Sequence, residues 1–188
     1  TQQAAQVNGE ITNLTTQMKA KQDEATALRT KIQQNQTKDA ELRQKITAKD
    51  TESQQLTARY NSEEQTRTQG VTTQTTALQN EIRTLQTQLS TATDATRAGI
   101  QGQIDTKNRA LNDLNTQSQT AYQTRYRQYQ TDQQRITTEG QALRTELQTL
   151  LNTNAALPQQ LADADAVAQR LQQQIAAYQQ RLTAINAN

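Results

Sequence analysis

The chain of 188 residues contains no cysteine and no histidine. Without cysteine there is no thiolate for catalysis, redox exchange or metal binding. Without histidine, the abundant serines and threonines lack the conventional base that would activate them as nucleophiles. The carboxylates are scattered, and Gly99 and Gly102 lack the lysine and the spacing of a phosphate-binding loop. We therefore expect no catalytic, metal or cofactor site, no small-molecule substrate and no enzymatic activity.

Phenylalanine and tryptophan are also absent, and aromatic residues make up only 3% of the sequence. With hydrophobic residues at 32%, the chain cannot fill a thick globular core. Glutamine and threonine dominate instead, as they do in many disordered segments. Disordered segments, however, are rich in proline and lack periodic apolar residues. This chain has a single proline and a regular apolar spacing, so we predict long helices with a core one or two side chains thick.

The charges are nearly balanced, with a formal net charge of +2, and both signs are interspersed along the chain. No basic cluster indicates a nucleic-acid or membrane surface, and no apolar run is long enough to cross a membrane. We expect protein partners, in a homo-oligomer or a larger assembly. The chain starts without methionine, which suggests a removed leader or a piece of a longer protein. Together with the low lysine and glutamate content and the lack of cysteine, this favours an extracytoplasmic or virion-associated setting.

A heptad pattern of apolar residues runs through the first third of the sequence. Core positions recur at alternating steps of three and four, from Val7 to Tyr60, which is the signature of a coiled coil. A second heptad stripe runs from Ile136 to Ile185. Two such stripes in one chain predict two helices that pack along their length.

The two stripes are mirror images about a centre between Asp94 and Ala95. The residue numbers in each mirrored pair add up to 189, so a chain folded once at its midpoint would bring the pairs face to face. The pairs are Val7 with Leu182, Ile11 with Tyr178, Leu14 with Ile175, Met18 with Leu171, Ala25 with Ala164, Leu28 with Leu161, Ile32 with Leu157, Leu42 with Leu147, Ile46 with Leu143, and Tyr60 with Tyr129.

This mirror predicts an all-α fold, a long antiparallel coiled-coil hairpin in the form of a rod. We expect one elongated domain, with a first arm over residues 3–91, a tip over 92–98 within a turn region near 91–99, and a second arm over 99–187. Pro158 removes a backbone hydrogen bond, so we expect a kink or break near 152–158. A two-helix core leaves much of the apolar stripe wet, which favours further bundling by self-association.

Two features inside the stripes sharpen the predicted register. Successive steps of four in each stripe form stutters, which coincide in the mirror at Val71 and Ser118. The polar core residues Asn35 and Asn154 are also a mirrored pair. We predict that they hydrogen-bond and set the register, at some cost in stability.

The segment 122–135 mixes tyrosines with arginines and permits two interpretations. One is base stacking on a basic helix, as in single-strand binders. The other, which we favour, is a core cluster, because Tyr122, Tyr126 and Tyr129 recur at helical steps of four and three and Tyr60 would face Tyr129.

We expect the tip to be the main candidate for partner recognition, through Thr93, Asp94, Thr96 and Arg97. These side chains are polar and lie at the turn, where they have few packing duties. The first functional hypothesis is a non-enzymatic structural protein, acting as a rigid spacer or scaffold component of a larger complex. The second is a receptor- or partner-binding arm of a larger secretion, efflux or toxin protein, and the third, less supported, is a nucleic-acid binder. No residue pattern indicates a particular biological process.

Overall fold

The computed structural model describes residues 1–187 and consists of three α-helices in that part of the chain, with no strand. Helix α1 spans Gln2–Ser90, α2 spans Asp94–Asn154 and α3 spans Leu157–Ala187. The chain divides into two compact units. The terminal unit holds residues 1–47 and 141–187, and the turn unit holds Ala48–Gly140.

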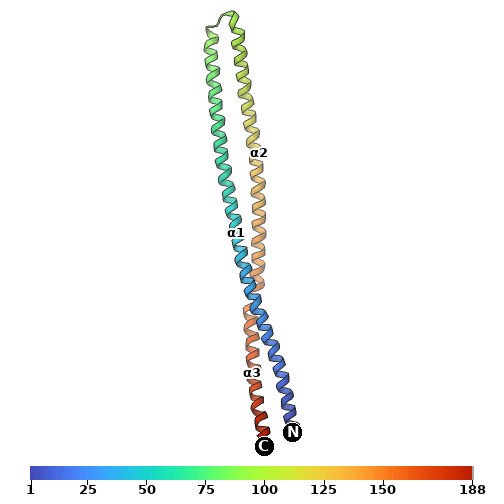
Figure 1. Cartoon of the computed structure of the whole chain (residues 1–188). Coiled ribbons are helices and arrows are strands. Elements are labelled where there is room, and N and C mark those ends of the chain that lie inside the picture. Colours follow the sequence, from blue (N-terminus) through green and yellow to red (C-terminus); the bar gives the residue numbers. More distant parts are fainter. Residues whose placement is uncertain (188) are drawn as a thin grey trace. The chain divides into compact units, whose positions relative to one another are not determined.

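In both units, α1 pairs with the returning chain (Figure 1). The all-α antiparallel hairpin predicted from the sequence is therefore confirmed. Contacts between the arms follow the predicted mirror closely. The stacked rings of Tyr60 and Tyr129 and the hydrogen-bonded pair Asn35 and Asn154 have numbers that add up to 189. For the ion pairs between arms the sums range from 184, at Lys38–Glu146, to 194, at Arg29–Asp165.

The turn lies in the turn unit and is short. Three residues, 91–93, separate α1 from α2, so residues 94–98 of the predicted tip form the first turn of α2 instead. The backbone N–H groups of Thr91 and Ala92 donate to carbonyls three residues back, at 3.3 Å each, which tightens the end of α1. No residue in the described chain has a cis peptide bond or a positive φ. The chain reverses with ordinary backbone conformations.

The predicted break near Pro158 is present and narrow. Helix α2 ends at Asn154 and α3 begins at Leu157, so Pro158 stands in the first turn of α3, where the lack of an N–H is tolerated. On either side the helical bonding is regular, from Ala155 N–H to the Leu151 carbonyl and from Gln160 N–H to the Ala156 carbonyl, at 3.1 Å each. The apolar stripe resumes directly, because Leu157 is buried.

The core of each unit is thin, and the terminal unit has a larger number of buried apolar side chains than the turn unit. The buried apolar residues of the terminal unit are Val7, Ala25, Leu42, Leu157, Ala164, Ala168, Leu171 and Ile175. In the turn unit only Ile104 and Ile136 reach the same degree of burial among the described apolar residues. Most other stripe residues of both units, such as Leu14 and Leu85, are half-buried.

Candidate functional site

The four predicted tip residues lie together around the start of α2. Thr93 is the N-cap, and its carbonyl accepts from the backbone N–H groups of Thr96, at 3.1 Å, and Arg97, at 3.0 Å. The hydroxyls of Thr93 and Thr96 lie 3.1 Å apart. The Arg97 guanidinium donates to the Ala92 carbonyl at 3.2 Å, so it ties the helix start to the turn. Three of the four residues thus have local structural contacts in addition to their exposure.

Asp94 differs from the other tip residues because its side chain is fully exposed. Within residues 1–187 the one ion pair seen for it is with Arg97, at a marginal 4.0 Å. At the first position of α2 the carboxylate faces the positive end of the helix dipole. Of the predicted recognition residues, Asp94 is the one whose charge is most available to a partner.

The predicted Asn pair meets between the arms of the terminal unit. The Asn35 amide Nδ2 donates to Oδ1 of Asn154, and both side chains are half-buried. Asn154 is the last residue of α2, so this polar layer stands directly beside the helix break. The structure brings the two residues together as the mirror requires; their role in setting the register stays a prediction.

The most distinctive side-chain cluster lies in the middle of the turn unit. Four of the five tyrosines of the chain gather there, and we call Tyr60, Tyr122, Tyr126 and Tyr129 the tyrosine cluster. The rings of Tyr60 and Tyr129 stack across the arms, with centroids 4.5 Å apart. Those of Tyr122 and Tyr126 stack along α2 at 5.9 Å and only 9° from parallel.

The cluster is half core and half surface. Tyr60 and Tyr129 are half-buried between the arms, as the core interpretation of the sequence predicts. Tyr122 and Tyr126 are 42% and 39% exposed, which makes them two of the three exposed large hydrophobic side chains in the described chain. The exposed pair has the geometry of a stacking platform, since parallel aromatic faces accept other flat or apolar groups.

Next to the tyrosine cluster, the side chains of Ser53, Thr57, Tyr129 and Gln133 form a hydrogen-bond network between the arms. The Tyr129 hydroxyl lies 3.1 Å from the Thr57 hydroxyl, and the Gln133 amide donates to both, at 2.8 Å to Thr57 and 3.3 Å to Tyr129. The Ser53 hydroxyl donates to the Gln133 side-chain carbonyl at 2.9 Å. The polar groups of these four side chains therefore find their hydrogen-bond partners within the network.

On the other side, arginines and glutamates enclose the cluster. The Arg67 guanidinium stands 5.9 Å from the centroid of the Tyr122 ring, a cation–π distance, and donates to the Ser118 hydroxyl at 2.6 Å. Arg67 also pairs with Glu64. This ion pair, with its hydrogen bond, lowers the pKa of the Glu64 carboxyl and raises that of Arg67.

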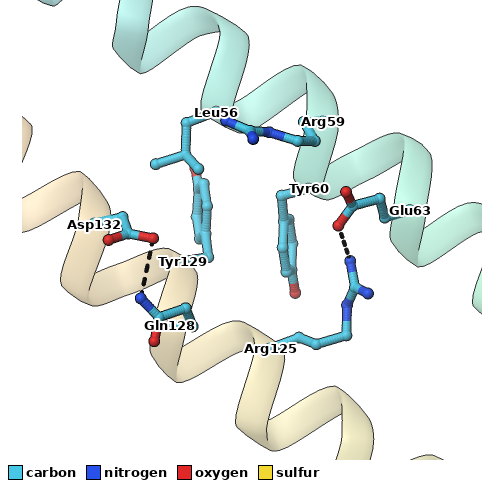
Figure 2. A pocket seen from close by; sticks show the side chains of 8 residues that line it. All are labelled: Leu56, Arg59, Tyr60, Glu63, Arg125, Gln128, Tyr129 and Asp132. Carbon is cyan, nitrogen blue, oxygen red and sulfur yellow. Dashed lines mark hydrogen bonds and ion pairs between the residues drawn. The ribbon is translucent and has the colours of Figure 1, made fainter.

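Figure 2 shows an open groove over the stacked rings of Tyr60 and Tyr129, with Arg59 above them and an ion pair between Arg125 and Glu63 at one side. The Arg125 Nε also lies 3.7 Å from Glu64 Oε2, and neither atom has a hydrogen-bond partner in the described structure. Arg67 and Arg125 beside the exposed tyrosines are both paired with glutamates of α1.

A second charged group spans the arms near the start of the turn unit. Lys49 pairs with Glu52 at 2.8 Å and with Glu139, and Arg135 pairs with Glu52 at 3.0 Å and with Glu139 at 3.2 Å. We call these four residues the charge network. Hydrogen bonds from Lys49 and then Arg135 lower the pKa of both glutamates. The same contacts raise the pKa of Lys49 and of Arg135.

Sequence reasoning missed the charge network, although the signal was present. Position 49 is a heptad core position occupied by lysine, and its mirrored position is Gly140, which is buried. A glycine opposite a core lysine leaves room for the aliphatic stem while the ammonium reaches the rim. In residues 1–187 no cluster of acidic residues could hold a metal ion, and no helix is long and apolar enough to span a membrane.

Comparison with known proteins gives no relative: no family model, no curated protein and no solved structure matches the chain significantly.

Proposed function

We propose that the chain is a non-enzymatic structural protein that serves as a spacer or scaffold component of a larger protein assembly, in an exported or virion-associated setting. The observation that carries this proposal is that polar side chains at the interface make contacts between the two arms. In both units, polar side chains at the interface between the arms, such as Asn35, Glu52 and Gln133, contact the opposite arm. Such a chain uses its polar side chains to hold two helices together.

The tip and the exposed tyrosines are two surfaces that offer contacts to a partner. Tyrosine and arginine are enriched among the residues that dominate protein–protein affinity, which favours Tyr122 and Tyr126 as a lateral docking surface. Asp94 at the start of α2 offers an exposed charge for end-on docking. The first surface suits lateral assembly, and the second suits a terminal contact.

The alternative is a partner-binding arm inserted in a larger protein. It is favoured by the placement of the chain ends, because the start of α1 and the end of α3 both lie in the terminal unit, whereas the turn lies in the other (Figure 1). An inserted arm needs entry and exit side by side. On this alternative, recognition would be concentrated at Thr93, Asp94, Thr96 and Arg97.

The test compares two surface variants in the native system. One replaces residues 92–97 with a neutral Gly/Ser link, and the other is Tyr122→Gln with Tyr126→Gln. The assembled fraction is measured by size-exclusion chromatography of the tagged chain, with helicity checked by circular dichroism. Loss of assembly in the tyrosine variant alone supports the scaffold, and loss in the tip variant alone supports the arm. A wild-type chain that elutes only as free protein, with no assembly altered by its deletion, contradicts both.

A further inference from the structure

The turn between the arms contains nothing that compels the chain to reverse. Residues 91–93 are Thr, Ala and Thr, without the glycine or proline that usually fixes a tight turn. Their backbone has no positive φ and no cis bond, and α1 runs into them through hydrogen bonds at 3.3 Å. A backbone of this kind is also compatible with a helix at each of these residues. A continuous helix from α1 into α2 is thus compatible with the local sequence.

The contacts between the arms are symmetric in a way that permits exchange. Each contact joins a residue of the first half to a residue near its mirror position in the second half, as with Asn35–Asn154, Tyr60–Tyr129 and Glu81–Lys107. Two straightened copies placed antiparallel would form every one of these pairs twice, between copies instead of within one. The arrangement is closed by a two-fold axis and leaves no arm unpaired.

We propose that the hairpin exchanges arms with a second copy of this chain, by straightening at residues 91–93 into an antiparallel two-chain dimer. Straightening would give the N–H groups of residues 93–95 carbonyl partners four residues back, which a helix start leaves free. The hairpin in turn keeps the Thr93 cap and the bond from Arg97 to the Ala92 carbonyl. Since the contacts between the arms are the same in both forms, protein concentration sets the balance.

The test uses the purified chain and three variants, each refolded from denaturant at low and at high protein concentration. Thr91→Ala with Thr93→Ala favours a continuous helix and removes the cap, so its dimer fraction should rise several-fold. A Gly-Asn-Gly insertion after Ala92 lengthens the turn and should abolish the dimer. Thr84→Ala with Thr87→Ala, at exposed positions of α1, is the matched control and should behave as wild type. Mass is read by sedimentation equilibrium.

Because the chain has no cysteine, the exchange can be trapped as a disulfide between copies. Chains carrying only Asn35→Cys are co-refolded with chains carrying only Asn154→Cys, and a covalent dimer is expected. Glu81→Cys with Lys107→Cys, a more exposed cross-arm pair placed on separate chains in the same way, repeats the test at a position where substitution disturbs the core less. A monomer at every concentration in all variants overturns the proposal. So does a dimer that forms neither disulfide, which would indicate side-by-side association of intact hairpins. None of these outcomes depends on the proposed scaffold function.

Discussion

The terminal unit and the turn unit pair the same two arms by different means. In the terminal unit, alanines stand at facing positions, and Ala25 and Ala164 are only 1% and 2% exposed. Small side chains on both helices allow close packing of the arms at this layer, and Leu171 and Ile175 farther along α3 are buried as well. In the turn unit, several layers instead hold tyrosine, arginine, glutamine or lysine.

These bulky and polar layers change what holds the arms together. The turn unit gains hydrogen bonds and ion pairs between its arms, but most of its apolar residues stay half-buried. A hydrogen bond contributes about 1 kcal/mol net, and an exposed ion pair contributes less, whereas a fully buried leucine contributes about 2–3 kcal/mol. The terminal unit should therefore be the more stable of the two, and the turn unit the one whose groups remain available to partners.

Truncating a core leucine in each unit should give the largest effects and the clearest contrast. Leu42→Ala in the terminal unit removes a side chain that is 3% exposed and should cost about 3 kcal/mol in the free energy of unfolding. Leu85→Ala in the turn unit removes a half-buried one and should cost about 1–1.5 kcal/mol. Urea unfolding followed by circular dichroism measures both. Equal losses in the free energy of unfolding would show that the two leucines are buried to the same extent in solution.

The Asn layer of the terminal unit tests whether a polar pair there serves specificity. Replacing both Asn35 and Asn154 with leucine should raise the free energy of unfolding by about 1–2 kcal/mol, because an amide pair gives way to apolar contact. Asn35→Leu alone should lower it by about 1–2 kcal/mol, since the Asn154 amide loses its partner. A fall in melting temperature for the double variant, with helicity retained, would mean that this pair does not occupy a core layer.

The hydroxyl of Tyr129 tests the hydrogen-bond network of the turn unit. Tyr129→Phe keeps the stacked ring but removes the group that contacts Thr57 and Gln133, and should cost about 1 kcal/mol. Tyr178 of the terminal unit is the matched control. It is also half-buried, and no hydrogen bond of its hydroxyl is seen within residues 1–187, so Tyr178→Phe should be nearly neutral. Equal effects of the two substitutions on the free energy of unfolding would show that the hydrogen bonds of the Tyr129 hydroxyl do not stabilise the fold.

The fold was predictable because one physical rule governs it. An apolar residue every three or four positions, mirrored about residue 94, leaves few arrangements other than a hairpin, and Pro158 located the break. The turn lies within the predicted region 91–99, but α2 begins at Asp94 instead of residue 99, because threonine and aspartate are as acceptable in a first helical turn as in a loop.

The tyrosine cluster was predictable only in part. Helical spacing put all four rings in the core, yet Tyr122 and Tyr126 are exposed. The stutter near Ser118 explains the difference, because two steps of four rotate the stripe relative to the helix surface and carry Tyr122 away from the interface. Which groups a long side chain contacts depends on its rotamer, which the spacing of residues in the sequence does not define. Arg67, which contacts Glu64, Ser118 and Tyr122, is an example.

Lowering the pH should weaken the charge network, and we expect this to be the smallest of the stability effects predicted for the two units. The pKa of Glu52 and of Glu139 is lowered in the folded chain by Lys49 and Arg135, so their contribution is complete above the ordinary value of 4.5 and is lost as the pH falls below it. Lys49 has a raised pKa, and its contribution persists up to about 10.5. Between these limits the network should make stability independent of pH.

The comparison of Glu52→Gln/Glu139→Gln with wild type measures this contribution. At pH 7 in low salt the double variant should melt at a slightly lower temperature, and the difference should shrink as the pH is lowered toward 3, because protonation of the wild-type glutamates removes their ion pairs. The difference should stay small, since these side chains are 39% and 41% exposed and screened by water and salt. Glu146→Gln, which removes the single pair with Lys38 in the terminal unit, should show a smaller difference with the same pH dependence. A gap that persists at pH 3 would mean that the glutamate side chains contribute through packing, and that the turn unit resembles the terminal unit more closely than its charges suggest.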